Sequence, residues 1–279
     1  VLNWCMDVGL IVRDRKCPNC GVLMRLVAQK KGSDGFGWIC RKKGRENPHR
    51  VTVSIRKDSW FEGSNLTIIN ILLIAYFWYF KAPNDLIIHD LNVAKATVVD
   101  WNGFCRAVCM DICVKESCTI GGKNETVELD EYQFGRGKNK DKNKNGSWVI
   151  GGIELRSHRT FFKVVEKRGK DVLLSIIKTY ILPGTTIISE CWKTYDCLDE
   201  EQFKRHAEEH SQKFKLPELA AHTSIQGTWA ALKKQLNRKH CEGHFDSYLA
   251  EYMWRRSHPK TYFPCFLDAI KKVYPTEQC

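Results

Sequence analysis

Three acidic side chains lie together in the stretch Val127–Gly137, which reads Val-Glu-Leu-Asp-Glu-Tyr-Gln-Phe-Gly-Arg-Gly. Its alternation predicts a β-strand in which Glu128 and Asp130 share one face, while Leu129 and Glu131 share the other. At least one acid would then point into an interior, where an unpaired carboxylate is costly and a bound divalent cation compensates its charge. The stretch therefore predicts a metal site, with a surface strand that has an acidic edge as the simpler alternative.

A second group of residues has the spacing of a zinc site. Cys17 and Cys20 form a Cys-x-x-Cys pair, Cys40 follows twenty residues later, and His49 comes after a basic loop. Three thiolates and one imidazole would make a tetrahedral Cys₃His site of the kind that holds a zinc ribbon together. Cys5 is the rival fourth ligand. The alternative is an idle Cys-x-x-Cys pair, with Cys40 as a buried hydrophobic residue.

Three helical segments follow this predicted ribbon. The apolar run Leu66–Phe80, capped by Ser64 or Asn65, is fifteen residues long, which is too short to span a bilayer comfortably and predicts a core helix. Asp85–Leu91 and Ala94–Cys113 are further helical stretches, separated by a tight turn. This order predicts a helix-turn-helix-like DNA-binding region or, more simply, an ordinary helical bundle.

The acidic strand opens a region with a different periodicity. Val127–Phe134, Trp148–Glu154 and Phe161–Glu166 are strand-like, Asp171–Tyr180 is helical, and Thr185–Ser189 is a short apolar strand. Three strands in a meander, a crossover helix and a fourth strand are the order of a ribonuclease H-like α/β fold.

That fold would position the acidic side chains. Parallel neighbours bring their carboxyl ends to one edge of a sheet, so Asp130 and Glu190, which follows the fourth strand, are expected to lie close together. Two carboxylates at one edge are typical of a divalent-metal site. A later helix, Thr223–Arg238, presents Gln226 and Lys233 at helical spacing.

The composition indicates the kind of partner. The 279 residues carry a formal net charge of +12, and the segment from Arg13 to Asp58 alone holds thirteen basic against four acidic residues. Such segregated charge predicts a polyanionic partner, double-stranded DNA ahead of a membrane. Thirteen scattered cysteines, with no secretory signal before them, predict reduced thiols in an intracellular protein, nuclear if its source is eukaryotic and otherwise cytoplasmic.

The residues expected to contact DNA are basic and come from three parts of the chain. They are Arg41, Lys42, Lys43, Arg45 and Arg50 in the ribbon, Lys95 and Arg106 in the helical region, and Arg136, Lys138 and Lys140 after the acidic strand. Bound zinc would hold the basic surface of the ribbon rigid for phosphate contacts. The changes in pattern predict a lead-in helix and zinc ribbon over residues 1–62, a helical region over 63–120 and the α/β domain over 121–279.

Several longer motifs carry a resemblance to a known family. They are Glu128-Leu-Asp-Glu-Tyr-Gln-Phe-Gly, Trp148-Val-Ile-Gly-Gly-Ile-Glu, Ile181-Leu-Pro-Gly-Thr-Thr-Ile-Ile-Ser, Cys191-Trp-Lys-Thr-Tyr and Gly227-Thr-Trp. In this order they resemble the core of the Merlin superfamily of DNA transposons and its bacterial insertion-sequence relatives. That family also begins with a zinc ribbon and a helical region, so the resemblance spans nearly the whole chain.

The resemblance implies a DDE transposase, in which three carboxylates on a ribonuclease H-like fold hold two divalent ions, Mg²⁺ or Mn²⁺. The first acid corresponds to Asp130. Glu190 stands where the family has Asp, Gln226 stands where it has Glu, and Lys233 matches a downstream basic residue. Glu190 shifts the oxygens by one methylene, and Gln226 removes a full negative charge from the ligand set.

Three hypotheses for the function follow. The first is a transposase-like protein that binds transposon terminal inverted repeats and target DNA as a homodimer or higher oligomer, with an impaired nuclease centre. The second is an active cut-and-paste transposase that tolerates both substitutions. The third is a zinc-stabilised interaction protein that does not bind DNA, for which duplex binding that weakens with salt would be absent.

Overall fold

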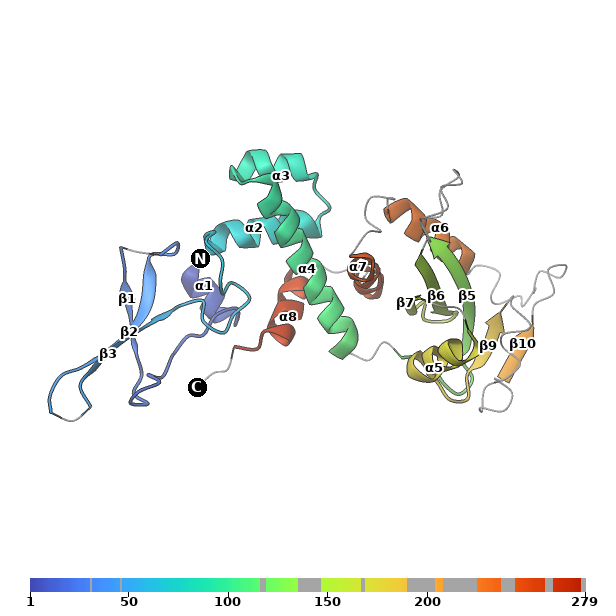
Figure 1. The fold of residues 1–279 in the computed structure, drawn as a ribbon, viewed down its shortest axis with the longest axis horizontal. Helices are drawn as coiled ribbons and strands as arrows, with labels where there is room; N and C mark the ends of the chain where they lie inside the picture. The colour runs from blue at the N-terminus through green and yellow to red at the C-terminus, as the bar shows by residue number, and fades with distance from the viewer. Residues whose placement is uncertain are drawn as a thin grey trace. The chain divides into compact units, whose positions relative to one another are not determined.

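A computed structural model describes residues 1–30, 32–45, 47–115, 119–134, 147–166, 169–189, 225–236, 244–258 and 263–276, and the backbone of 204–207. The chain forms two compact units, drawn in Figure 1. The first comprises Val1–Val108 with Lys260–Cys279, and the second comprises Cys109–Pro259. The C-terminal segment thus belongs with the first unit, whereas the sequence pattern grouped it with the α/β domain.

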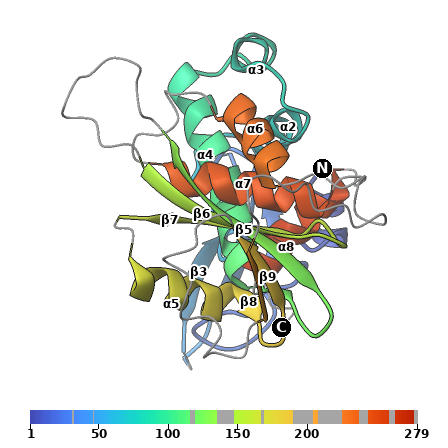
Figure 2. The same cartoon turned by 90° about the vertical axis from the view of Figure 1, so that its right-hand side faces the viewer.

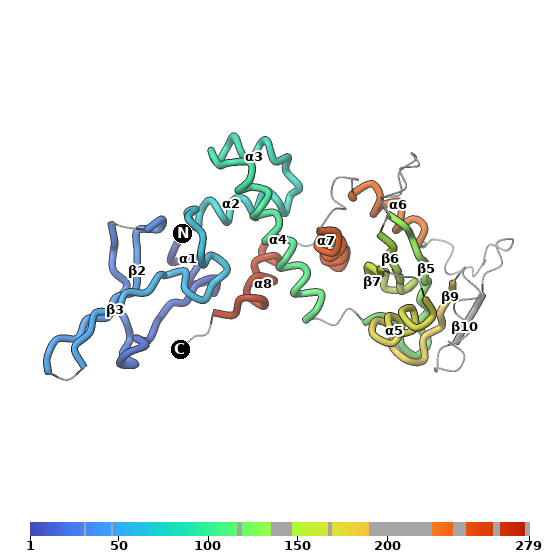
Figure 3. Tube along the Cα trace, in the orientation of Figure 1, coloured from blue at the N-terminus to red at the C-terminus, as the bar shows by residue number. Residues whose placement is uncertain are grey.

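The first unit contains the expected small antiparallel sheet. Strands β1 (Arg25–Ala28), β2 (Phe36–Lys42) and β3 (His49–Ser54) pair in that order. Figure 3 draws this part of the chain in blue. An isolated bridge between Lys16 and Leu23 closes the turn that carries the Cys-x-x-Cys pair. This arrangement is the predicted ribbon.

The expected helices follow the ribbon. They are α2 (Ile68–Tyr79), α3 (Asn84–Leu91) and α4 (Lys95–Lys115), and Asn92 ends α3 in a left-handed conformation, with φ at 49°. The buried face of α2 includes Ile71, which is fully buried, so the apolar run forms a core helix as predicted. Among the residues that the structure describes, no helix combines the length and apolar character needed to cross a membrane.

The start of α2 differs from the prediction. Its cap is Thr67, whose Oγ1 accepts a hydrogen bond from the N–H of Asn70 at 3.1 Å, rather than Ser64 or Asn65. The buried guanidinium of Arg56 donates to the carbonyl oxygens of Ser64 and Leu66, at 2.7 and 2.5 Å. These long-range bonds hold the preceding segment outside the helix, which therefore begins later.

Two terminal helices complete the first unit. The lead-in helix α1 (Leu2–Asp7) has six residues and is followed by a turn at Gly9, whose φ is +77°. Helix α8 (Pro264–Val273) packs Phe266 against Trp78, with ring centroids 4.9 Å apart. This aromatic contact explains why the C-terminal helix belongs to the first unit.

The second unit is built on a five-stranded sheet of order β10-β9-β5-β6-β7. Its strands are β5 (Thr126–Phe134), β6 (Ser147–Glu154), β7 (Thr160–Val165), β9 (Thr186–Ser189) and β10 (Lys204–Ala207). The first three form an antiparallel meander, and β9 and β10 add to β5 in parallel. This order confirms the predicted ribonuclease H-like fold.

Helices cover both faces of the sheet, as Figure 2 shows for the second unit. Helix α5 (Lys170–Tyr180) packs on one face, while α6 (Ile225–Gln235) and α7 (Phe245–Ser257) pack on the other. A short parallel pair, β4 (Ile120–Gly121) with β8 (Ile181–Leu182), was not predicted. Two-residue strands leave almost no periodic signal in a sequence.

Candidate functional site

The carboxylate of Asp130 is held on the face of β5 that is covered by α6. Its Oδ2 accepts a hydrogen bond from the indole Nε1 of Trp229 at 2.9 Å, and its Oδ1 accepts one from the N–H of Glu131 at 2.7 Å. Both oxygens are thus oriented by neighbours. The last described pair between β5 and β9 is Leu129 with Ser189, the residues that directly precede Asp130 and Glu190.

Helix α6 runs along β5 in a matched register. The N–H of Ile225 donates to Glu128 Oε2 at 2.9 Å, and Lys233 Nζ lies 3.8 Å from the centre of the Tyr132 ring. The hydrogen bond from Trp229 to Asp130 lies between these two contacts. Successive contacts are therefore two residues apart on the strand and four residues apart on the helix. Two strand residues advance by about 6.6 Å, and four helix residues advance by about 6 Å. The two elements therefore stay in step, and the predicted sharing of one face by Glu128 and Asp130 is observed.

Two glycines of β6 make room for the rings on either face of the sheet. Gly151 pairs with Asp130, and a Cβ there would lie 2.7 Å from the Trp229 indole. Gly152 pairs with Leu129, and a Cβ there would lie 2.4 Å from the Phe161 ring on the opposite face. Gly151 thus permits the close approach by which Trp229 reaches Asp130.

The other predicted catalytic residues are placed only in part. Gln226 and Lys233 lie on α6, seven residues apart and on the same side of the helix, and both are exposed. Glu190 lies outside the described residues. The structure therefore brings Asp130 and the helix that carries Gln226 together, and it leaves the expected position of the second acid as a prediction.

The predicted zinc ligands form a compact cluster in the first unit. The ligand atoms of Cys17, Cys20, Cys40 and His49 all lie within 4.8 Å of one another. Cys20 and Cys40 sulfurs are 3.7 Å apart, and His49 Nε2 lies 3.5 and 3.4 Å from the sulfurs of Cys17 and Cys40. A tetrahedral zinc with ordinary bond lengths would give edges of about 3.8 Å between sulfurs and about 3.6 Å between sulfur and nitrogen. The donor set therefore fits Zn²⁺.

The second nitrogen of the histidine supports this interpretation. His49 Nδ1 is 2.8 Å from the carbonyl oxygen of Asn47, so Nδ1 carries the proton and Nε2 presents its lone pair to the sulfurs. Asn47 has φ at 49° and donates from its side chain to the carbonyl oxygen of Asn19, at 3.2 Å. The turn before β3 is thereby tied to the Cys-x-x-Cys turn.

The thiols of the cluster have opposite pKa shifts. Burial acts to raise the pKa of Cys17, but hydrogen bonds from the N–H groups of Asn19 and Cys20 and from neighbouring thiols outweigh it and lower this pKa to about 7. Burial, followed by the hydrogen bonds and charges of its neighbouring sulfurs, raises the pKa of Cys40 to about 11. A dication removes this repulsion between sulfurs. Cys5, the rival ligand, is fully buried outside the cluster, and burial raises its pKa to about 11.

The basic residues expected at the DNA differ in exposure. Those of the β2–β3 hairpin are all exposed, as is Lys95 at the start of α4; the hairpin residues are Arg41, Lys42, Lys43, Arg45 and Arg50. Arg106 is only 8% exposed, so its side chain is not presented to a duplex as expected. On α4 it lies three residues before the fully buried Cys109, at the edge of the buried side of the helix. Arg136, Lys138 and Lys140 lie outside the described residues.

Arg56 is a buried basic residue of the same unit. Its Nε donates to Asp34 Oδ2 at 2.5 Å, and the two side chains are 7% and 9% exposed. It is a structural cation that links the ribbon to the segment before α2.

Comparison with known proteins gives one family match. Residues 120–257 match the model of the ISXO2-like transposase domain. No curated protein matches the chain. This segment covers the five-stranded sheet, Asp130 and the helices on both faces.

Several solved structures are similar to the chain at low identity. The HTLV-2 integrase catalytic core domain in complex with magnesium has 13% identity and a TM-score of 0.32, covering 49% of this chain and 88% of that one. The simian T-cell lymphotropic virus intasome has 10% identity and a TM-score of 0.35, covering 75% of this chain and 78% of that one. The BIV integrase catalytic core domain has 10% identity and a TM-score of 0.33, covering 53% of this chain and 97% of that one. The fold assignment itself rests on the strand order. Residues 120–257 are thus similar to transposase domains of the DDE class.

Proposed function

We propose that the chain is a DNA-binding protein derived from transposases of the Merlin superfamily, which recognises transposon terminal inverted repeats and has a weakened nuclease centre. The match to a transposase domain over residues 120–257 supports descent from a transposase. The single observation that carries the DNA-binding role is the exposed basic hairpin whose two strands each carry a zinc ligand, Cys40 on β2 and His49 on β3. A second copy of the chain and two DNA ends are its proposed partners.

The hairpin supports a direct prediction about salt. Because its five exposed cations would displace counterions from phosphates, the affinity for duplex DNA is expected to fall on the order of a hundredfold or more between 50 and 200 mM salt. Replacing Lys42 and Lys43 with Gln should reduce the salt slope by about 2 without changing zinc content. Fluorescence anisotropy over a salt series measures both quantities. Binding that does not respond to salt would favour a protein–protein role instead.

The weakened centre follows from the charges around Asp130. Asp130 and Glu190 would hold a divalent ion, which when bound activates a water or a 3′-hydroxyl and stabilises the leaving oxygen. Trp229 and the N–H of Glu131 orient the Asp130 carboxylate. Gln226 contributes an amide without charge from α6, so less negative charge faces the ions than in a site with three carboxylates.

A cleavage assay separates a weakened centre from an active one. We expect the chain to bind terminal-repeat duplexes and to cut them no faster than its Asp130→Asn variant in Mg²⁺ or Mn²⁺. The double variant Glu190→Asp with Gln226→Glu restores the carboxylate set, and it is expected to raise cleavage at least tenfold, since one misplaced group can cost on the order of a hundredfold. Cleavage by the unaltered chain that depends on Asp130 would contradict the weakened centre.

One observation favours the rival proposal of an active transposase. The support of Asp130 is complete, since Trp229 reaches it over Gly151 and both carboxylate oxygens have partners. A protein that never uses this carboxylate has no need of that arrangement. The same cleavage assay decides between the two.

A further inference from the structure

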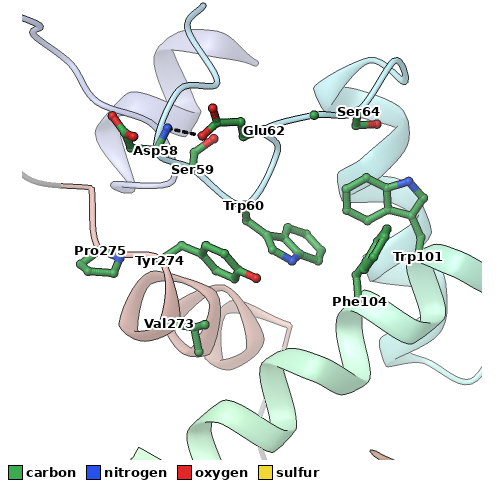
Figure 4. A pocket seen from close by; sticks show the side chains of 11 residues that line it. Asp58, Ser59, Trp60, Glu62, Ser64, Trp101, Phe104, Val273, Tyr274 and Pro275 are labelled. Atoms are coloured by element: carbon green, nitrogen blue, oxygen red, sulfur yellow. Dashed lines mark hydrogen bonds between the residues drawn. The ribbon is translucent and has the colours of Figure 1, made fainter. Parts of the chain in front are cut away.

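A cavity of about 600 Å³ lies in the first unit, apart from the zinc cluster and the carboxylate face. Three segments line it: the loop after β3 from Asp58 to Ser64, helix α4, and the residues Val273–Pro275 at the end of α8 (Figure 4). Its volume is within the range of ordinary small-molecule sites, which is about 300–1,000 Å³. It is large enough for one planar heterocycle with its attached sugar.

Four aromatic rings form the walls. Trp60 and Trp101 meet edge to face, with centroids 5.1 Å apart, and Trp101 meets Phe104 in the same way at 5.2 Å. Each tryptophan is 6% exposed, whereas Phe104 is 50% exposed and Tyr274 37%. In Figure 4, Trp60 lies between Tyr274 and Phe104. The cavity therefore has a fixed aromatic floor and two rings with open surface, as a stacking site for a flat ligand requires.

The rim is polar but its charges are paired. Asp58 accepts from Arg15 at 2.9 Å and lies 3.3 Å from Lys57 Nζ, while Glu62 accepts from Lys57 Nζ and from the N–H of Asp58, at 3.0 and 2.8 Å. The hydrogen bond from Arg15 lowers the pKa of Asp58, and that from the N–H of Asp58 lowers the pKa of Glu62. Both acids are thus ionised at neutral pH and repel a phosphate, and their remaining lone pairs can accept from an N–H donor.

We propose that this cavity binds a single nucleobase, presented by an unpaired nucleotide of the bound DNA. A nucleobase is flat, uncharged and edged with N–H donors, which suits the aromatic walls and the acceptor rim. A base within a duplex is stacked and cannot enter a concave site, so the nucleotide has to be unpaired or turned out of the helix. The inference rests on the proposed DNA binding, because the basic hairpin of the same unit would hold the backbone.

Two probes test the cavity. The first is a short duplex with one extra, unpaired 2-aminopurine nucleotide, compared with the same duplex fully paired, both titrated with the zinc-loaded full chain. We expect roughly tenfold tighter binding to the bulged duplex, the scale of stacking on one aromatic side chain, together with quenching of the 2-aminopurine fluorescence. The second probe is free 2-aminopurine riboside, which tests the cavity even if the chain does not bind duplex DNA.

The chain offers a matched control for the key ring. Phe104→Ala is expected to abolish both the preference for the bulge and the quenching, whereas Val99→Ala, on the same helix and 47% exposed, should leave both unchanged. Tyr274→Ala, at the other end of the row of rings, should weaken both.

Four results would overturn the proposal. They are equal affinity for the two duplexes, retention of the preference and quenching by Phe104→Ala, failure of the riboside to bind, and binding of tetramethylammonium in place of the riboside. Failure of the paired duplex to bind, with the riboside still bound, would instead contradict the proposed function and leave the cavity as a nucleobase site.

Discussion

Cys17→Ser is expected to unfold the β1–β3 ribbon and abolish duplex binding, while the transposase domain stays folded. Every residue of β1 is exposed, and on β2 only Gly37 and Trp38 are buried, so the sheet has little apolar core of its own. In small zinc domains, zinc binding contributes roughly 10–16 kcal/mol to the free energy of folding. Hydrogen exchange over residues 25–54 should lose its protection, and the zinc stoichiometry should fall from one to zero.

Cys5→Ser is the matched control for this prediction. Cys5 is fully buried in the same unit, and it lies outside the group of four ligands. Replacing the thiol with a buried hydroxyl should lower the free energy of unfolding by about 1–3 kcal/mol. One zinc should still bind, and the ribbon should keep its protection from hydrogen exchange. A Cys17→Ser protein that kept both its zinc and its exchange protection would show that the four residues do not act as the metal site.

The zinc cluster was predictable because its signal is local. Fixed ligand types at short spacings identify the site before any contact is known, and the hairpin joins Cys40 to His49 within ten residues. The meander, the helix and the fourth strand were predictable for a similar reason, since they follow one another along the chain, whereas β10 was not predicted. Each inference needed only neighbouring segments.

Two failures of prediction involve contacts between segments that are separated in the sequence. The start of α2 depends on Arg56, which binds carbonyl oxygens eight and ten residues later and pairs with Asp34. The place of α8 depends on Phe266 meeting Trp78, nearly two hundred residues away. Neither partner is visible from propensity or periodicity, because tertiary contacts override local preference.

The sequence contained an ambiguous indication of the contact between Trp229 and Asp130. Adjacent glycines inside a strand indicate close approach by something bulky, and Trp229 stands three residues after Gln226 in the motif that resembles the family. Nothing in the sequence states which ring approaches Gly151 and which approaches Gly152. That assignment required the sheet register and the position of α6.

The second prediction with a large effect tests whether Trp229 positions Asp130 for a metal ion. Trp229→Phe keeps most of the packing but removes the N–H that donates to Asp130 Oδ2. Loss of an outer partner of a metal ligand typically costs 10–100-fold in metal affinity, and we expect a loss of about that size. The measurement is Mn²⁺ binding by electron paramagnetic resonance, with Asp130→Asn defining the component that belongs to this site. The variant with Glu190→Asp and Gln226→Glu serves as background if the unaltered chain binds Mn²⁺ too weakly to measure.

Substitutions of Gly151 and Gly152 distinguish an effect on the position of Asp130 from an effect on the stability of the sheet. Gly151→Ala would place a Cβ 2.7 Å from the Trp229 indole, and Gly152→Ala would place one 2.4 Å from Phe161 on the opposite face. Both should destabilise the sheet by overpacking, by about 1–3 kcal/mol. Only Gly151→Ala should weaken Mn²⁺ binding, and combining it with Trp229→Phe should add little, since both act through one hydrogen bond. Equal losses of Mn²⁺ binding in the two alanine variants would show that Trp229 serves only to pack the core. A loss of Mn²⁺ binding confined to Gly151→Ala would mean that Gly151, the Trp229 indole and Asp130 act together to position a metal ligand. This arrangement would then be intact although Gln226 cannot supply the third negative charge.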